Sequence, residues 1–217
     1  MKGLLSLITF LPAFFCGYKT VAQRSSSRLS IVVSPALFVP VTVAVQAGVQ
    51  YRANNRFSIL AEAALPTFHP DNTEYEKIEY WRTGIEFKYF MRRDSSFSKY
   101  VSLQNNYLFR ELTDIDQALF YSKTQSFSYT NAVIKSPVFS SALKLGVELN
   151  AGKRFFFDAF VGGGLRFVFT QYQAKNILVT STEPPKQGLF KFDDAWKYNY
   201  TLMRLHGSGG LRFGVRL

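Results

Sequence analysis

The sequence predicts an all-β fold: a closed antiparallel transmembrane β-barrel of about eight strands, with short periplasmic turns and longer extracellular loops. Three observations predict it. Apolar and polar residues alternate with a period of two in many segments, as in VTVAVQAGVQYR at residues 41–52. The connections between these segments are alternately short and long, and the chain ends on GLRFGVRL, which alternates up to Leu217. A barrel needs such a final strand in order to close against its first strand.

The first residues of the chain are interpreted as a secretory signal peptide. An apolar stretch at 3–16 follows a lysine, and Thr20-Val21-Ala22 suits cleavage before residue 23. The expected domains are thus a signal peptide over 1–22 and an outer-membrane β-barrel over 23–217. An uncleaved anchor and a lipid on Cys16 are alternatives, but the apolar stretch is too short to span a bilayer and the residue before Cys16 is a bulky phenylalanine.

The first half of the chain predicts a leading strand near residues 28–33 and two hairpins. In the first hairpin, strand 41–52 and a strand over 57–65 flank Asn54-Asn55, a composition typical of tight turns. In the second, WRTGIEFKYF at 81–90 and a strand over 101–109 are joined by the short polar stretch RRDSSFS. Each strand alternates apolar with small or polar residues, so each has two unlike faces.

The second half predicts a third hairpin and the closing strand. Strand 139–149 meets RFFFDAFVGGGLRFVF, residues 154–169, through the turn sequence Asn-Ala-Gly-Lys. The closing strand covers 203–217. The remaining connections, near 66–78, 111–137 and 171–199, are long, and long connections in such barrels lie outside the cell.

The two faces of the predicted strands differ in chemistry. One carries bulky side chains such as Trp81, Phe87 and Phe157, and the other carries glycines and charges. A soluble lipocalin-like barrel would point the apolar set inward, but a lumen of about eight strands has little room, so we expect the bulky set to face lipid. The expected lumenal charge network consists of Glu62, Arg82, Glu86, Lys88, Lys144, Glu148, Asp158, Arg166 and Arg212. It predicts either a structural plug of ion pairs or a narrow ion path.

The C-terminal strand carries a resemblance to a known class of proteins. Leu211–Leu217 resembles the terminal strand of Gram-negative outer-membrane barrels, which the barrel-assembly machinery recognises and which typically ends on an aromatic residue; this chain ends on a leucine. The stretches YWRTGIEFKYF, FSSALKLGVELNAGKRFFFDAFVGGGLRF and VTVAVQAGVQYRANNRFSILAEA resemble a family of small OmpA-like outer-membrane β-barrels of unknown function. The resemblance implies an outer-membrane location in contact with lipid and lipopolysaccharide, and it brings no catalytic residues.

One pair of residues is a candidate for catalysis. His206 and Ser208 lie two apart on a predicted strand and therefore share a face, as a base and a nucleophile would. The pair resembles the His-x-Ser of outer-membrane lipid A deacylases, which are also small barrels. However, no acidic residue follows to orient the histidine, and parity puts both side chains on the lumenal face with Arg212. Polar filling of the lumen is the competing interpretation.

The other chemical candidates are weaker. His69 with Asp71 lacks a second imidazole or thiolate for a metal, and Gly162–Gly164 lacks the helix and lysine of a phosphate loop. No cofactor and no metal site are therefore predicted. The net charge is +11, but no long basic cluster predicts nucleic-acid binding, so anionic lipids and surface glycolipid phosphates are the expected neighbours.

The long connections over 111–135 and 171–199 are rich in aromatic residues. These residues either extend the strands above the membrane or form a binding surface for an unknown protein. Together the patterns predict a non-enzymatic outer-membrane β-barrel with a structural, surface-recognition or envelope-assembly accessory role. A lipid A-acting barrel enzyme and a narrow pore are the alternatives. The aromatic residues of these connections include Phe120, Tyr121, Tyr172, Phe190, Phe192 and Trp196.

Overall fold

The fold is all-β and is dominated by one large antiparallel sheet. The computed structural model describes residues 28–39, 42–68, 75–93, 96–114, 118–180, 183–190 and 195–217. The expected signal peptide at 1–22 and the pair His69 and Asp71 lie outside the described residues. Over the parts of the chain that the structure describes, no helix has the length and apolar character to cross a membrane.

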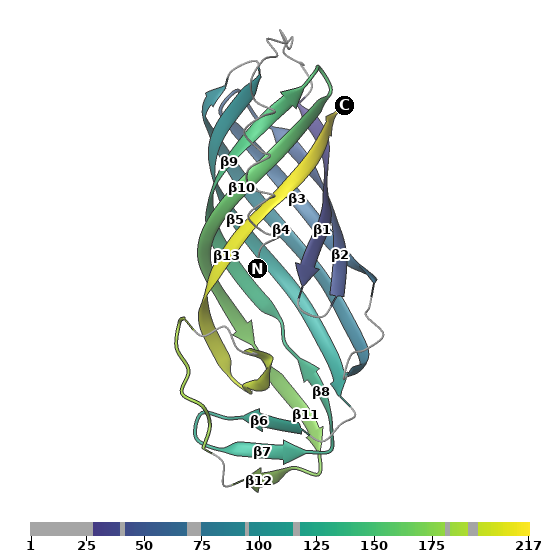
Figure 1. Ribbon diagram of the computed structural model, residues 1–217, viewed down its shortest axis with the longest axis vertical. Helices are drawn as coiled ribbons and strands as arrows, with labels where there is room; N and C mark the ends of the chain where they lie inside the picture. Colours follow the sequence, from purple (N-terminus) through teal and green to yellow (C-terminus); the bar gives the residue numbers. More distant parts are fainter. Residues whose placement is uncertain are drawn as a thin grey trace, which may run out of the picture.

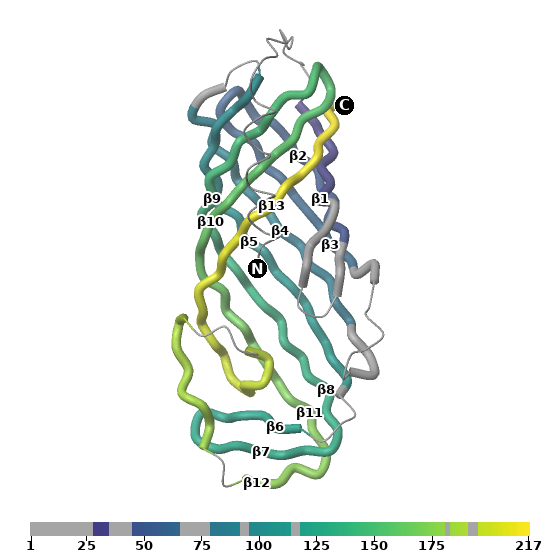
Figure 2. The backbone as a smooth tube through the Cα atoms, viewed as in Figure 1, coloured from purple at the N-terminus to yellow at the C-terminus, as the bar shows by residue number. Residues whose placement is uncertain are grey.

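Eight strands form a ring in which each is hydrogen-bonded to a neighbour on both sides, as Figures 1 and 2 show. Consecutive strands are antiparallel neighbours, and the last strand pairs with the first. Every strand that the alternation predicts is present. The ring strands are β1 (Leu29–Val39), β2 (Thr42–Arg52), β3 (Phe57–Phe68), β4 (Tyr75–Arg93), β5 (Phe97–Asp114), β9 (Val138–Ala151), β10 (Phe155–Phe169) and β13 (Thr201–Arg216).

The β2–β3 and β9–β10 turns lie at one end of the ring, here called the turn end, together with Leu29 and Leu217, whose backbones are hydrogen-bonded; the connection between β1 and β2, also short, lies toward the opposite end. In the β2–β3 turn, the Asn54 carboxamide oxygen accepts hydrogen bonds from the backbone N–H groups of Arg56 and Phe57 at 2.8 and 2.9 Å. In the β9–β10 turn, Gly152 has a φ of 76°, a conformation that favours glycine. The turn residues therefore match the conformations that the predicted hairpins need.

The opposite end of the ring, the cap end, contains more regular structure than the sequence predicts. β8 (Asn131–Lys135) and β11 (Gln171–Lys175) pair with each other and extend the wall beyond β5. A separate three-stranded sheet lies across this end in Figure 1. Its strands are β6 (Ala118–Tyr121), β7 (Ser126–Tyr129) and β12 (Leu178–Thr180), and the short 3-10 helix η2 (Ala195–Lys197) lies beside β6.

Aromatic residues of the long connections form the core of this cap. Phe120 is buried and stacks on Tyr172 and Phe127 with ring centroids 4.5 and 5.0 Å apart. The Tyr172 hydroxyl donates a hydrogen bond to the backbone oxygen of Trp196. These residues thus support the strand extension, whereas Phe190 is 75 % exposed. Stacked rings pack this end because the connections are long enough to fold on themselves.

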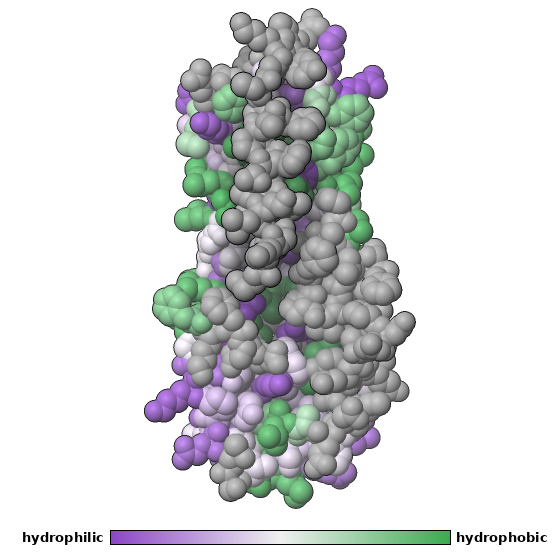
Figure 3. All heavy atoms as spheres, viewed as in Figure 1, coloured by the Kyte–Doolittle hydropathy of each residue, from purple (hydrophilic) through white to green (hydrophobic). Residues whose placement is uncertain are grey.

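The two faces of the ring are separated as the alternation predicts. Trp81, Phe87, Phe157 and Phe213 are exposed, and Figure 3 shows hydrophobic side chains along the flanks of the turn-end half. The residues between them in sequence, including most of the charged ones, are buried inside the ring. A soluble domain would place these sets the other way round.

Two prolines lie within strands rather than in the connections, where proline is more usual. Pro35 lies in β1 where the β1–β2 register shifts between Ser34 and Leu37, and Pro66 lies in β3 beside a second register shift. Proline has no N–H to donate to a sheet, and a bulge removes the need for one. Both departures lie toward the cap end of the β1–β2–β3 wall.

Candidate functional site

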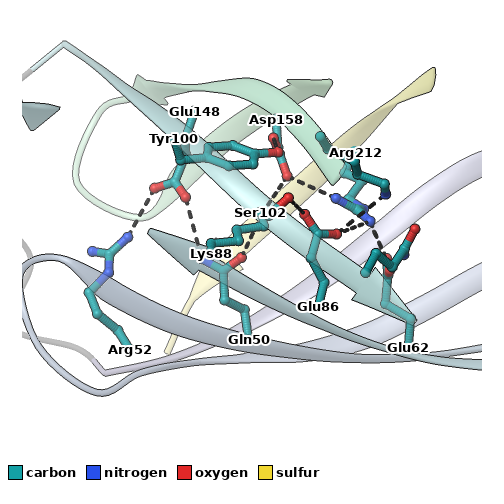
Figure 4. A network of polar contacts seen from close by, with 12 residues as sticks. Gln50, Arg52, Glu62, Glu86, Lys88, Tyr100, Ser102, Glu148, Asp158 and Arg212 are labelled. Carbon is teal, nitrogen blue, oxygen red and sulfur yellow. Dashed lines mark hydrogen bonds and ion pairs between the residues drawn. The ribbon is translucent and has the colours of Figure 1, made fainter. Parts of the chain in front are cut away.

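The candidate site is the interior of the ring, where side chains from seven strands meet in one polar network (Figure 4). Seven residues of the expected lumenal charge network take part in it: Glu62, Glu86, Lys88, Lys144, Glu148, Asp158 and Arg212. All seven are 6 % exposed or less. Alternation alone predicts that these charges point inward, and all seven side chains are buried in the interior of the ring.

Arg212, on the terminal strand, is the centre of the network. Its guanidinium contacts Glu62 at 2.8 and 2.9 Å, Glu86 at 2.7 Å and Asp158 at 3.2 Å. These carboxylates come from β3, β4 and β10, so one side chain connects both sides of the ring. Arginine suits this position because its planar fork presents several donors in fixed directions.

Further donors complete the hydrogen bonding of the same carboxylates. Lys88 approaches Asp158 at 2.6 Å, and the Tyr100 hydroxyl donates to the other oxygen of Asp158 at 2.6 Å. Lys144 lies 3.5 Å from Glu86 and only 3.8 Å from the centre of the Phe160 ring. Ser102 and Gln104 donate to Glu86 and Glu62. A buried carboxylate needs such partners, because removal from water penalises its charge.

A second group surrounds Glu148 near the turn end. Arg52 and Arg216 contact the same Glu148 oxygen at 3.0 and 2.9 Å, and Arg216 also bonds Asn150. Gln50 joins the two groups: its amide donates to Glu148 and its oxygen accepts from Lys88. The sequence prediction omitted Gln50, Arg52 and Arg216, although Arg216 alternates in phase with Arg212 and the other two lie on the small or polar face of the strand over 41–52.

The network is nearly neutral and fills the space that it occupies. Its four carboxylates face five cations, namely Arg52, Lys88, Lys144, Arg212 and Arg216. Ion pairs buried in this way are costly to break, because the partner left behind keeps its desolvation penalty. The arrangement connects strands and leaves its members little exposure to solvent.

Large aromatic side chains also lie inside the ring of strands, which corrects the expectation that the lumen holds only glycine and charged residues. Phe156 and Tyr100 are buried, and a Cβ on Gly214 or Gly146 would run into these rings. Phe160 packs over Gly210 in the same way, and its ring forms cation–π contacts with Lys144 and Arg212. The inward glycines therefore make room for neighbouring aromatic rings, a relation between strands that alternation within one strand does not reveal.

Arg82 and Arg166 depart from the expected network. Both lie on inward-facing positions, but they are only partly buried and neither forms an ion pair with a carboxylate in the described structure. Arg166 is the direct cross-strand partner of Arg204, another cation. The structure thus places these two residues apart from the ion pairs of the network, because the four carboxylates of the network lie nearer the turn end.

His206 and Ser208 occupy the interior face, as parity predicts. Their cross-strand partners are Gly164 and Gly162, and they alternate in phase with Arg212. No hydrogen bond joins the two side chains in the described part of the protein. The charged groups that act on His206 are Arg82, Arg166 and Lys144, all cationic, so the structure supplies no carboxylate to orient the imidazole.

The remaining candidates do not assemble a site. Gly162–Gly164 lies within β10, where a Cβ on Gly162 or Gly164 would meet the backbone of β9. Close strand approach therefore explains two of these glycines. Among the described residues, no group of three or more His, Cys, Asp or Glu side chains could hold a metal ion.

Comparisons of the chain with protein-family models, with curated proteins and with solved structures found no match. The functional argument therefore depends on the geometry of the ring and of its interior.

Proposed function

We propose that this protein is a non-enzymatic outer-membrane β-barrel with a structural, surface-recognition or envelope-assembly accessory role. In this proposal the eight-stranded ring is a closed barrel that spans the membrane. The observation that carries the proposal is the separation of the faces: apolar side chains such as Ile85, Leu145 and Leu211 are exposed, while the charged side chains between them are buried. Hydrocarbon around the ring explains both features.

The orientation follows from the connections. The β2–β3 and β9–β10 turns, the start of β1 and the end of β13 lie at the turn end, which we assign to the periplasm, so that the cap would lie outside the cell. The terminal strand, Leu211–Leu217, would be the segment read by the barrel-assembly machinery, and lipid and lipopolysaccharide would contact the flanks. The cap then presents a folded surface on a rigid scaffold, which suits recognition of a partner.

The charge network favours a plugged barrel over a narrow pore. Seven charged side chains at 6 % exposure or less occupy the interior near the turn end. An ion would have to displace these paired charges in order to pass. Reconstitution in planar bilayers tests this directly: we expect no stepwise conductance from the purified protein, and steady single-channel steps would establish the pore instead.

A lipid A-acting enzyme is the other alternative, and His206 with Ser208 would carry it. We expect the lipid A profile of cells to be the same with the protein and with its His206→Ala variant. Loss of a modified lipid A species in the variant, at equal protein abundance, would establish the enzyme.

The test of the proposal itself is location. We expect the protein in the outer-membrane fraction, with a gel mobility that differs between unheated and heated samples, as a folded barrel shows. The variant Lys153→Gln changes an exposed residue at the turn end and serves as a control. It should show the same location and the same gel mobility as the wild type. A periplasmic or inner-membrane location of the folded protein would overturn the proposal.

A further inference from the structure

The cap-end half of the interior gathers basic side chains: among the described residues, Glu62 acts on Arg82, but no carboxylate is among the charged groups that act on Arg166 or His206. Arg82 on β4, Arg166 on β10, and Arg204 and His206 on β13 all occupy inward positions of their strands. Arg166 and Arg204 are direct cross-strand partners, and His206 is within electrostatic range of Arg82, Arg166 and Lys144. These four residues are named the basic cluster.

Within the basic cluster, the positive charge of Arg166 is not neutralised by an ion pair with a described carboxylate. Like charges directly opposite each other on neighbouring strands destabilise a sheet. Arg166 makes no ion pair in the described structure, and its Nε is buried without a hydrogen-bond partner. The Nε atoms of Arg52 and Arg216 are buried without a hydrogen-bond partner too, but those two residues are paired with Glu148 through another nitrogen. Arg166 has no such ion pair, and a bound anion would supply one.

Solvent reaches this level of the interior. Arg82, Arg166, His206 and Ser208 are partly exposed, although their strands point them inward. The charged residues of the turn-end network are almost fully buried by comparison. Three residues of the basic cluster are therefore accessible to solvent, whereas the fourth, Arg204, is 1 % exposed.

Among the described residues, the wall beside the basic cluster is paired along its full length on one side and over a short stretch on the other. On one side, β13 pairs with residues Phe155–Phe169 of β10, which is the whole length of β10. On the other side, its described pairing with β1 covers only Ser30–Val33 of β1. Figure 1 shows β1 and β13 diverging from this point toward the cap end. The described contact on that edge is with a loop, since the Leu205 N–H donates to the Leu189 oxygen at 3.1 Å. The strand that holds Arg204 and His206 thus borders a partly unpaired seam.

We propose that the basic cluster binds a phosphate group, and that this group belongs to a lipid whose headgroup enters through the β1–β13 seam. Guanidinium forks bind phosphate oxygens in pairs, and His206 and Ser208 add donors at the same level. The +11 net charge would raise the local concentration of such an anion. The phosphate site itself stands on the side chains alone, and only the lipid source depends on the proposed position in the membrane.

The experiment is a binding titration of the purified full chain in neutral detergent micelles. One arm uses dihexanoyl phosphatidic acid, the second uses dioctanoylglycerol, which lacks the phosphate, and the third uses inorganic phosphate. We expect saturable binding of phosphatidic acid and none of dioctanoylglycerol. Binding of inorganic phosphate alone would keep the phosphate site but overturn the lipid source, and absence of both would overturn the proposal.

Variants separate a site from general charge attraction. Arg166→Gln should weaken phosphatidic acid binding by tenfold or more, whereas Arg154→Gln, an equal charge loss at the exposed start of the same hairpin strand, should leave it within twofold. Arg166→Glu places opposite charges across from each other at Arg204, so it should fold at least as well and bind least of all. Equal weakening by Arg154→Gln, or unchanged binding in Arg166→Glu, would overturn the proposal. A protein found outside the outer membrane but still binding phosphate would refute the proposed function alone.

Discussion

The two halves of the interior differ in how their charges are balanced. Near the turn end, each carboxylate faces one or more cations, and the side chains fill the space. Near the cap end, Arg166 faces Arg204 across neighbouring strands, and Arg166 keeps partial exposure while Arg204 is buried. The same alternation of the strands directs both sets inward. The difference shows that direction follows from strand periodicity, whereas the role of a buried charge depends on what the other strands place beside it.

The comparison predicts that the turn-end network is the stronger contributor to stability. Arg212→Ala removes the cation shared by Glu62, Glu86 and Asp158 and leaves buried carboxylates with fewer partners. We expect the free energy of unfolding to fall by about 3–5 kcal/mol, the usual cost of breaking a buried ion pair. Urea unfolding of the reconstituted protein, followed by tryptophan fluorescence, measures this loss.

Two variants control that experiment. Arg154→Ala removes a cation at an exposed position of the β9–β10 turn and should leave the unfolding midpoint unchanged. Arg212→Lys keeps the charge but not the planar fork, so it should lie between the wild type and the alanine variant. If Arg212→Ala and Arg154→Ala unfold alike, the network contributes nothing to stability.

Packing of the turn-end half gives the second prediction. A Cβ on Gly214 would run into the Phe156 ring, whereas a Cβ on Gly207 of the same strand meets nothing within 4 Å. Gly214→Ala should therefore destabilise the protein by about 1–3 kcal/mol through overpacking. Gly207→Ala is the matched control and should change the unfolding midpoint little. Equal effects of the two substitutions would contradict the tight filling of this half.

The difference between the halves also explains how far the sequence alone predicts the protein. Alternation predicts the eight ring strands and the inward direction of residues such as Asp158, because both depend on the period of a single strand. It does not predict which inward charges meet. That depends on the relative heights of residues on strands far apart in the chain, as for Glu62 and Arg212. For this reason Arg166 was grouped with carboxylates that the structure places elsewhere.

The structure of the cap end also depends on contacts between segments far apart in the sequence. The sequence predicts long connections there, but the cap sheet depends on rings from three separate segments, Phe120, Phe127 and Tyr172. Short strands such as β12 show no extended alternation, so they could not be recognised in advance.

The third prediction reverses the imbalance of the cap-end half. Arg166→Glu converts a pair of like charges with Arg204 into a pair of opposite charges on neighbouring strands. The protein should gain about 0.5–1 kcal/mol, within the range of cross-strand charge pairs. The same unfolding assay measures the gain. Arg166→Gln removes the repulsion without adding attraction and should give a smaller increase. A loss of stability in both variants would mean that Arg166 already contributes favourably where it is.

The smallest expected effect comes from an ion pair of the same chemistry outside the ring's interior. Lys135 and Glu111 lie 3.5 Å apart at the cap end, with side chains 42 % and 27 % exposed. Water screens such a pair, so Glu111→Gln should cost at most about 0.5 kcal/mol after allowing for this exposure. Glu86→Gln, the same change at a buried carboxylate that contacts Arg212, should cost several times more. Unfolding midpoints of the two glutamine variants, measured side by side in low and high salt, decide the matter. High salt should change only the effect of Glu111→Gln on the unfolding midpoint, because the charges around Glu86 are shielded from the solvent.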